Sequence, residues 1–218
     1  ADGRMITQGP QIATYPGPAL PNLLVRQLDE AATRTLLDDA FAAGVRSGAD
    51  FGTPGVADAP TTRIDVVREG VTSTVSVMAL REAMAEDPQL TAAQRAARAK
   101  LAAFLARLDE MAAAPGQQPY RAQTLAALAR AYDLPDDGLP QKPGPIAWPG
   151  PALPGEYLNP NVKIGCVTVS GPQRDAVLAA AEDGNQNTPW VSGGNEYLVT
   201  FRPLLPDETG CGDLKAAR

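Results

Sequence analysis

Hydrophobic and polar residues alternate most regularly between residues 61 and 80. In TTRIDVVREGVTSTVSVMAL, the apolar Ile64 and Val66 alternate with charged neighbours, and Val75 and Val77 repeat the same spacing in a second run. Glu69–Gly70 separates the two runs and suits a tight turn. An alternation of period two is typical of strands with one buried face and one wet face. The pattern therefore predicts an antiparallel hairpin.

A helical period of apolar residues precedes this hairpin. A short apolar run at 22–25 predicts a strand, and the apolar positions within Leu36–Phe41 then recur on one helical face. Asp29 is a suitable N-cap, because its carboxylate can accept the free amides of a first helical turn. Gly44 suits the end of the helix.

The middle of the chain predicts two helices. Thr91 and Gln94 have the spacing of a capping box, and a helix from there to about residue 113 carries leucines on one face. Pro115–Gly116 ends it. The alanine- and leucine-rich segment 121–132 predicts a second, shorter helix.

The last third predicts a strand at 162–169, a helix at 174–184 and a strand at 195–206. Ser170 and Gln173 repeat the capping-box spacing, with proline early in the helix. We expect an α+β fold with antiparallel sheets packed against helices. The expected divisions are an N-terminal lobe at 1–90, a helical insert at 91–133, a proline-rich connector at 134–160 and a C-terminal strand–helix–strand lobe at 161–218.

Two nearly identical heptapeptides, YPGPALP at Tyr15–Pro21 and WPGPALP at Trp148–Pro154, each precede a strand–helix–strand order. One explanation is a degenerate internal duplication, with two α/β lobes separated by the helical insert. The other is chance recurrence in a chain with 21 prolines and 20 glycines. In either case the aromatic residue is expected to pack on a domain while the prolines carry extended chain across its surface.

Charge and hydropathy exclude several classes of partner. The 218 residues hold 19 Lys and Arg against 25 Asp and Glu, a net charge of −6. An acidic surface repels phosphate backbones and anionic lipid, which argues against nucleic acid. No apolar run approaches the length of a membrane span. The chain opens on a polar stretch rather than a signal peptide, and a leader removed upstream of Ala1 is compatible with this start.

The two cysteines are 45 residues apart and match no metal or redox spacing. Cys166 lies in a predicted strand and Cys211 in the polar tail. A disulfide between them would pin the C-terminus onto the last sheet and indicate an extracytoplasmic location. The alternative is two reduced, unrelated thiols.

The absence of histidine removes histidine-dependent catalysis and nearly all histidine-ligated metal sites. Paired carboxylates or a serine remain for a hydrolase, although no local pattern favours either. Asp183, Asn185 and Asn187 have the first spacings of a calcium loop. Thr188 and Gly194 stand where such a loop has glycine and glutamate, so a helix stop and turn is the favoured interpretation.

The aromatic and polar residues near the last strand form a candidate binding surface. Trp190 is expected in a loop with Ser192 and Asn195, which combines an aromatic with flexible polar neighbours, and Tyr15 and Trp148 of the heptapeptides are added to them. The alternative for Trp190, which we favour, is a tryptophan that caps the edge of the core.

The segments 41–45, 57–80, 189–190 and 201–211 (FAAGV, ADAPTTRIDVVREGVTSTVSVMAL, PW and FRPLLPDETGC) resemble exported proteins and lipoproteins of high-GC Gram-positive bacteria. The resemblance covers roughly residues 11 to 211 and carries no assigned activity. It implies that the protein is exported. One possibility that the resemblance implies is a lipid anchor attached upstream of Ala1. We therefore expect an extracytoplasmic binding or accessory protein of the cell envelope that acts through protein–protein contacts, without catalysis or a cofactor. The alternatives are a hydrolase and a secreted inhibitor.

Overall fold

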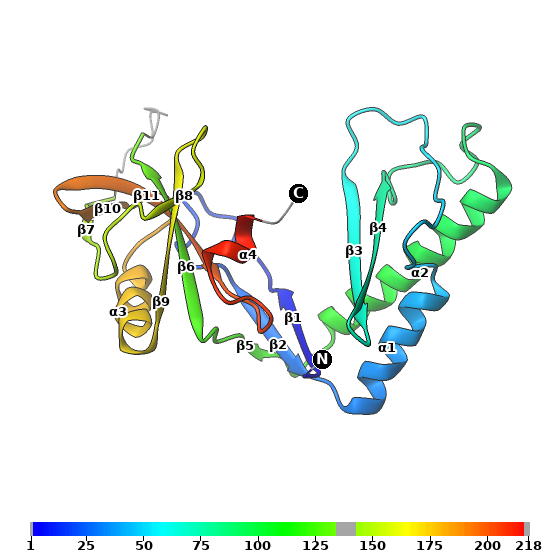
Figure 1. Ribbon diagram of the computed structural model, residues 1–218, viewed down its shortest axis with the longest axis horizontal. Helices are drawn as coiled ribbons and strands as arrows, with labels where there is room; N and C mark the ends of the chain where they lie inside the picture. The colour runs from blue at the N-terminus through cyan, green and yellow to red at the C-terminus, as the bar shows by residue number, and fades with distance from the viewer. Residues whose placement is uncertain (1, 134–142, 216–218) are drawn as a thin grey trace. The chain divides into compact units, whose positions relative to one another are not determined.

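A computed structural model describes residues 2–133 and 143–215 (Figure 1). The fold is α+β, as the sequence predicts. The helices are α1 (Glu30–Ala42), α2 (Ala92–Ala113), α3 (Gly171–Glu182) and α4 (Cys211–Lys215). The strands are β1 (Arg4–Gln8), β2 (Leu23–Gln27), β3 (Thr61–Arg68), β4 (Val71–Met78), β5 (Gln118–Pro119), β6 (Thr124–Ala131), β7 (Ile146–Ala147), β8 (Glu156–Asn159), β9 (Ile164–Ser170), β10 (Pro189–Ser192) and β11 (Asn195–Pro203).

The chain divides into two compact units. Unit 1 comprises Ala1–Thr7 and Val25–Gln118, and unit 2 comprises Gln8–Leu24 and Pro119–Arg218. The chain therefore passes between the units three times, in β1, β2 and β5, and these strands form a three-stranded sheet of order β1-β2-β5. Both heptapeptides belong to unit 2.

Unit 1 is built on the hairpin β3–β4, drawn in cyan in Figure 1, with α1 and α2 beside it. The strands pair along their whole length, and Glu69 and Gly70 both take positive φ at the turn, as a two-residue hairpin requires. The alternating valines Val66, Val75 and Val77 are buried. They share a core with residues of both helices, so the predicted hairpin with one covered face is confirmed.

The predicted ends of α1 and α2 are also confirmed. The Asp29 carboxylate accepts from the Ala32 amide at 2.7 Å. Thr91 and Gln94 satisfy each other's backbone amides in a complete capping box. Gly44 follows α1 with a φ of 95°, a left-handed conformation in which glycine has no steric penalty.

A buried arginine fastens the loops of unit 1 to α2. Arg98 is 6% exposed, and its guanidinium donates to the carbonyl oxygens of Phe51, Met78 and Ala79 at 3.2, 2.8 and 2.6 Å. Burial lowers the pKa of Arg98, which the nearby charge of Asp87 partly offsets. Because these carbonyls belong to separate segments, one side chain joins the chain before β3 to the end of β4.

Unit 2 contains a six-stranded sheet of order β7-β10-β11-β6-β9-β8. The β7–β10 pair is parallel and the other described pairs are antiparallel. Helix α3 packs on one face through Val177 and Ala181. The core on this face includes three aromatic rings, those of Trp148, Trp190 and Phe201.

The other face of the sheet is partly covered by the C-terminal tail. Cys166 of β9 forms a disulfide with Cys211, the first residue of α4, with 6.0 Å between the Cα atoms. Around the disulfide, Ala126 and Leu204 are buried and Leu214 packs against them. The disulfide predicted from the sequence is thus present, and it attaches the tail to the sheet.

The predicted short helix at 121–132 is wrong, because this segment is the central strand β6. Leu125 and Ala127 face the α3 side of the sheet, whereas Ala126 faces the disulfide side. A strand buried on both faces is apolar throughout, and such a run has the same composition as a buried helix. Strand pairing on both sides overrides the helix propensity of its alanines.

Three smaller expectations also need correction. Ser170 precedes α3, but its side chain makes no capping hydrogen bond, so the second capping box is absent. The expected connector 134–160 contains β7 and β8, and its residues 134–142 lie outside the described part. Trp190 lies in strand β10 rather than in a loop.

The segments after the two heptapeptides differ in topology. After the first, β2 and the hairpin β3–β4 belong to separate sheets, whereas after the second, β8 to β11 all join one sheet.

Candidate binding surfaces

Trp190 and Trp148 lie in the core of unit 2, so neither ring is free to contact a partner. Trp190 is 1% exposed and Trp148 is 8% exposed. Their ring centroids are 5.6 Å apart in an edge-to-face arrangement, and Phe201 completes the cluster at 5.4 and 6.2 Å. These are the separations that aromatic pairs prefer. For Trp190 the structure thus supports the core interpretation.

Ser192 and Asn195 have local structural roles. The Ser192 hydroxyl accepts from the Leu153 amide at 3.1 Å and so ties β10 to the second heptapeptide. Asn195 donates to the Gly193 carbonyl at 3.5 Å across the β10–β11 turn. Gly193 and Gly194 take φ of 59° and 79° in that turn.

Tyr15 is the exposed aromatic residue of the predicted set, with 60% of its surface accessible. Its hydroxyl accepts from the Asn187 side-chain amide at 3.1 Å. The backbone of the first heptapeptide is held as well, since the Gln186 amide donates to the Gly17 carbonyl at 2.9 Å and Pro18 forms a β-bridge with Asn185.

The calcium candidates form a compact turn. Asp183 is the C-cap residue of α3. The Asn185 side-chain oxygen accepts from the Asn187 amide at 2.9 Å, and the Asn185 amide donates to the Thr188 hydroxyl at 2.8 Å. The structure thus shows the helix stop and turn. Within residues 2–133 and 143–215, no three His, Cys, Asp or Glu side chains gather as a metal ion would require.

Several carboxylates that adjoin a second acidic residue in the sequence form ion pairs with arginines. The pairs are Asp38–Arg68, Asp39–Arg107, Asp109–Arg81 and Glu208–Arg202. Hydrogen bonds lower the pKa of four carboxyl groups in the described chain, those of Asp2, Asp50, Asp65 and Asp213. A general acid needs a raised pKa, so these four groups are suited to accepting hydrogen bonds and not to donating protons.

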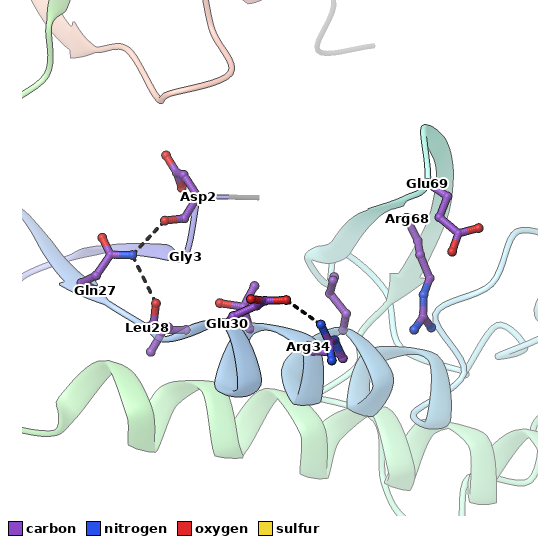
Figure 2. A pocket seen from close by; sticks show the side chains of 10 residues that line it. Asp2, Gly3, Gln27, Leu28, Glu30, Arg34, Arg68 and Glu69 are labelled. Carbon is purple, nitrogen blue, oxygen red and sulfur yellow. Dashed lines mark hydrogen bonds and ion pairs between the residues drawn. The ribbon is translucent and has the colours of Figure 1, made fainter.

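An open cleft of about 550 Å³ lies among the described residues of unit 1. It lies between β1–β2, the first turns of α1 and the tip of the β3–β4 hairpin. Figure 2 shows Asp2, Gln27 and Leu28 on one side, Glu30 and Arg34 of α1 below, and Arg68 and Glu69 at the hairpin tip. We call this hollow the hairpin cleft.

The hairpin cleft is lined by charges of both signs. Arg34 pairs with Glu30 at 2.6 Å, and both side chains are largely exposed. Arg68 pairs with Asp38 at 2.7 Å and lies over the Phe41 ring, 5.3 Å from its centroid. Solvent access weakens such pairs, so they can be exchanged for pairs with a ligand at little cost.

Two exposed valines lie at the hairpin tip, next in the chain to cleft-lining residues or to the turn, but neither lines the cleft. Val67 and Val71 flank the tip residues Arg68 and Glu69, and they are 60% and 67% exposed. Val67 could have been recognised from the sequence, because it follows the inward Val66 and must lie on the wet face of the hairpin. Arg34, Arg68 and Glu69 have no distinctive sequence pattern, and only the fold brings them together.

Comparisons with protein-family models, with curated proteins and with solved structures found no match. Among the described residues, no helix has the length and apolar composition needed to cross a membrane.

Proposed function

We propose that this protein is an extracytoplasmic binding or accessory protein of the cell envelope, and that the hairpin cleft is its contact surface for a protein partner. The observation that carries the proposal is the composition of the cleft. The hollow has exchangeable charges of both signs, and the hairpin tip that contributes to it also carries the exposed Val67 and Val71, so polar and apolar groups of the kinds found in protein interfaces occur on one hairpin.

The disulfide supports the proposed location. Disulfides persist in oxidising compartments outside the cytoplasm, and this one attaches the chain's tail to its largest sheet. The alternative hydrolase would need two carboxyl groups facing each other across a cleft, one with a raised pKa.

Site-specific photo-cross-linking tests the contact surface. A photoreactive residue at Val71 is expected to give adducts with a distinct envelope protein in native membranes, identified by mass spectrometry. The matched control carries the same group at Val162, which is 57% exposed in unit 2. Recovery of only free or self-linked protein from the Val71 variant, or the same adducts from both positions, would contradict the proposal.

Charge reversal adds a second test. Combining Arg34→Glu with Glu69→Lys in the Val71 probe protein should reduce the adduct yield severalfold, since both cleft charges change sign. Arg130→Glu, at an exposed position of unit 2, should leave the yield unchanged. Equal adduct yields from the double charge-reversal protein and the Arg130→Glu protein would show that the cleft charges do not contribute to partner binding.

A further inference from the structure

A second, smaller cavity lies wholly within unit 2 and shares no lining residue with the hairpin cleft. Its volume is about 160 Å³. The end of the first heptapeptide, the segment before β6, helix α3 and the end of β11 all contribute to its walls. We call it the α3 pocket and follow five of its lining residues, Leu20, Arg121, Leu125, Arg174 and Leu178.

The interior of the α3 pocket is apolar. Leu125 of β6 is 1% exposed, and Leu20 and Leu178 pack against the core to which it belongs. A dry cavity of roughly 150 Å³ with a lining of this kind accommodates a benzene ring. The α3 pocket therefore has room for one six-membered ring or for a branched aliphatic group of similar size.

Hydrogen bonds hold the walls of the α3 pocket in place. Arg174 of α3 donates to the Ala122 carbonyl at 3.0 Å and so joins the helix to the segment before β6. The Tyr120 hydroxyl donates to the Leu204 carbonyl at 2.7 Å and joins that segment to the residue after β11. A pocket whose walls are already held in place avoids the cost of ordering them when a ligand binds.

One of the three charged side chains that line the pocket is left without a partner in the described chain. Arg174 and Asp175 pair with each other at 2.6 Å. Arg121 is exposed, and across both described ranges no hydrogen bond or ion pair uses its side chain. The lining thus carries one uncompensated positive charge. A guanidinium next to an apolar cavity suits a ligand with an anion beside its apolar group.

The number of charges distinguishes a carboxylate ligand from a phosphate. A carboxylate carries one negative charge at neutral pH, which a single guanidinium balances. A phosphate monoester carries about 1.5 to 2 negative charges. Part of that charge would stay unbalanced beside the buried Leu125, which is unfavourable in an apolar environment.

We propose that the α3 pocket binds a small monocarboxylate, with its ring or branched aliphatic group against Leu125 and its carboxylate on Arg121. The site adds a small-molecule ligand to the protein contacts proposed above. It lies in unit 2, so it does not depend on the proposed partner of the hairpin cleft in unit 1.

Matched small molecules test the ligand class. Benzoate, phenylacetate and isocaproate are titrated into the purified full chain by isothermal titration calorimetry, and at least one should bind with a Kd of about 1 mM or lower. The neutral amide of the best ligand lacks the charge, and acetate lacks the apolar group, so each should bind about tenfold or more weakly. Absence of binding by all three carboxylates, or tighter binding of phenyl phosphate, would overturn the proposal.

A charge variant tests the role of Arg121. Arg121→Gln should weaken binding of the best carboxylate about tenfold or more, because it removes the unpaired guanidinium. Arg130→Gln is the matched control, since it removes the same charge from an exposed position of unit 2 outside the pocket. Its affinity should equal that of the wild type. Equal affinities of the two variants would overturn the assignment of the carboxylate to Arg121.

A filled pocket tests the position of the ligand. Ala122 is 8% exposed and lines the pocket, so Ala122→Leu should occupy its space and abolish binding. Circular dichroism and the urea midpoint report whether this variant is folded. A folded Ala122→Leu protein with wild-type affinity would overturn the proposal. The Arg121→Gln result stands independently of this variant, because an exposed side chain without a partner holds no part of the fold.

Discussion

Trp148 and Tyr15 lead two copies of the same Pro-Gly-Pro-Ala-Leu-Pro sequence, and their surroundings differ sharply. The Trp148 ring lies among the rings of Trp190 and Phe201, and its indole N–H donates to the Pro151 carbonyl at 2.6 Å. Tyr15 remains 60% exposed and contacts a surface turn through its hydroxyl.

The leucines of the two heptapeptides differ much less. Leu153 is buried in the core of unit 2, and Leu20 packs against the same core. The prolines and the leucine thus secure both segments to one unit, whereas the role of the aromatic residue depends on what surrounds it. A repeated motif therefore shows shared anchoring and does not show shared function.

The largest expected effect comes from removing the buried aromatic. Trp148→Ala should lower the free energy of unfolding by about 3 to 5 kcal/mol, because it opens a cavity in the ring cluster. Urea denaturation followed by circular dichroism measures the change. Tyr15→Ala is the matched control and should cost less than about 1 kcal/mol. Equal losses of unfolding free energy in the two variants would contradict the difference in burial between Trp148 and Tyr15.

The elements after the second heptapeptide carry the disulfide, and the first has no such tether. The double variant Cys166→Ala/Cys211→Ala should lose about 3 to 4 kcal/mol, since it releases a closed loop with a sequence separation of 45. Thermal unfolding with and without reductant measures the loss. Two titratable thiols in the denatured, unreduced protein would show that the disulfide does not form.

The glycines at equivalent positions offer a finer comparison. A Cβ on Gly150 would lie 2.6 Å from the Trp148 ring, so Gly150→Ala should cost about 1 to 3 kcal/mol. On Gly17 it would lie 3.2 Å from the flexible end of Gln186, and Gly17→Ala should be nearly neutral. Urea midpoints of the two variants decide this. A larger loss at Gly17 would contradict the packing described for Trp148.

The hydroxyl of Tyr15 has a small expected effect. Tyr15→Phe removes its hydrogen bond with Asn187, which is exposed, so the loss should be below about 1 kcal/mol. Differential scanning calorimetry is sensitive enough to detect it. Asn187→Ala should give a similar loss, and the double variant should cost no more than either single one. Additive losses would indicate that the two groups act independently.

The smallest effect concerns the tail that the disulfide holds. The Thr209 amide and hydroxyl and the Gly210 amide hold the pKa of Asp213 below its ordinary value of about 3.9. This carboxylate therefore contributes stability above that value, and the contribution is lost as pH falls through the lowered pKa. Asp213→Asn should flatten the decline in stability below about pH 4, measured by urea unfolding from pH 7 to pH 2.5. An unchanged slope would contradict it.

Local chemistry was sufficient to predict the starts of α1 and α2 and the hairpin, although not the cap of α3. Asp29 and Thr91 cap helices because their side chains reach amides within three residues, and Glu69–Gly70 turns because both residues tolerate positive φ. These interactions need no distant partner. The disulfide could be predicted because Cys166 and Cys211 are the only two cysteines in the chain.

Distant partners decided the features that the sequence could not predict. Segment 124–131 is a strand because β9 and β11 pair with it, one on each side. Its alanines and leucines do not indicate from the sequence that these two strands will lie beside it. The hairpin cleft likewise joins residues from three separate segments.

By itself, the sequence determined the α+β class, the caps, the hairpin and the cysteine pair, since each depends on neighbouring residues or on a unique partner. Only the tertiary structure decided that Trp148 is buried while Tyr15 is exposed, and that β6 lies inside a sheet with a strand paired on each side. The physical reason is that burial and strand pairing depend on surfaces contributed by residues far away in the chain.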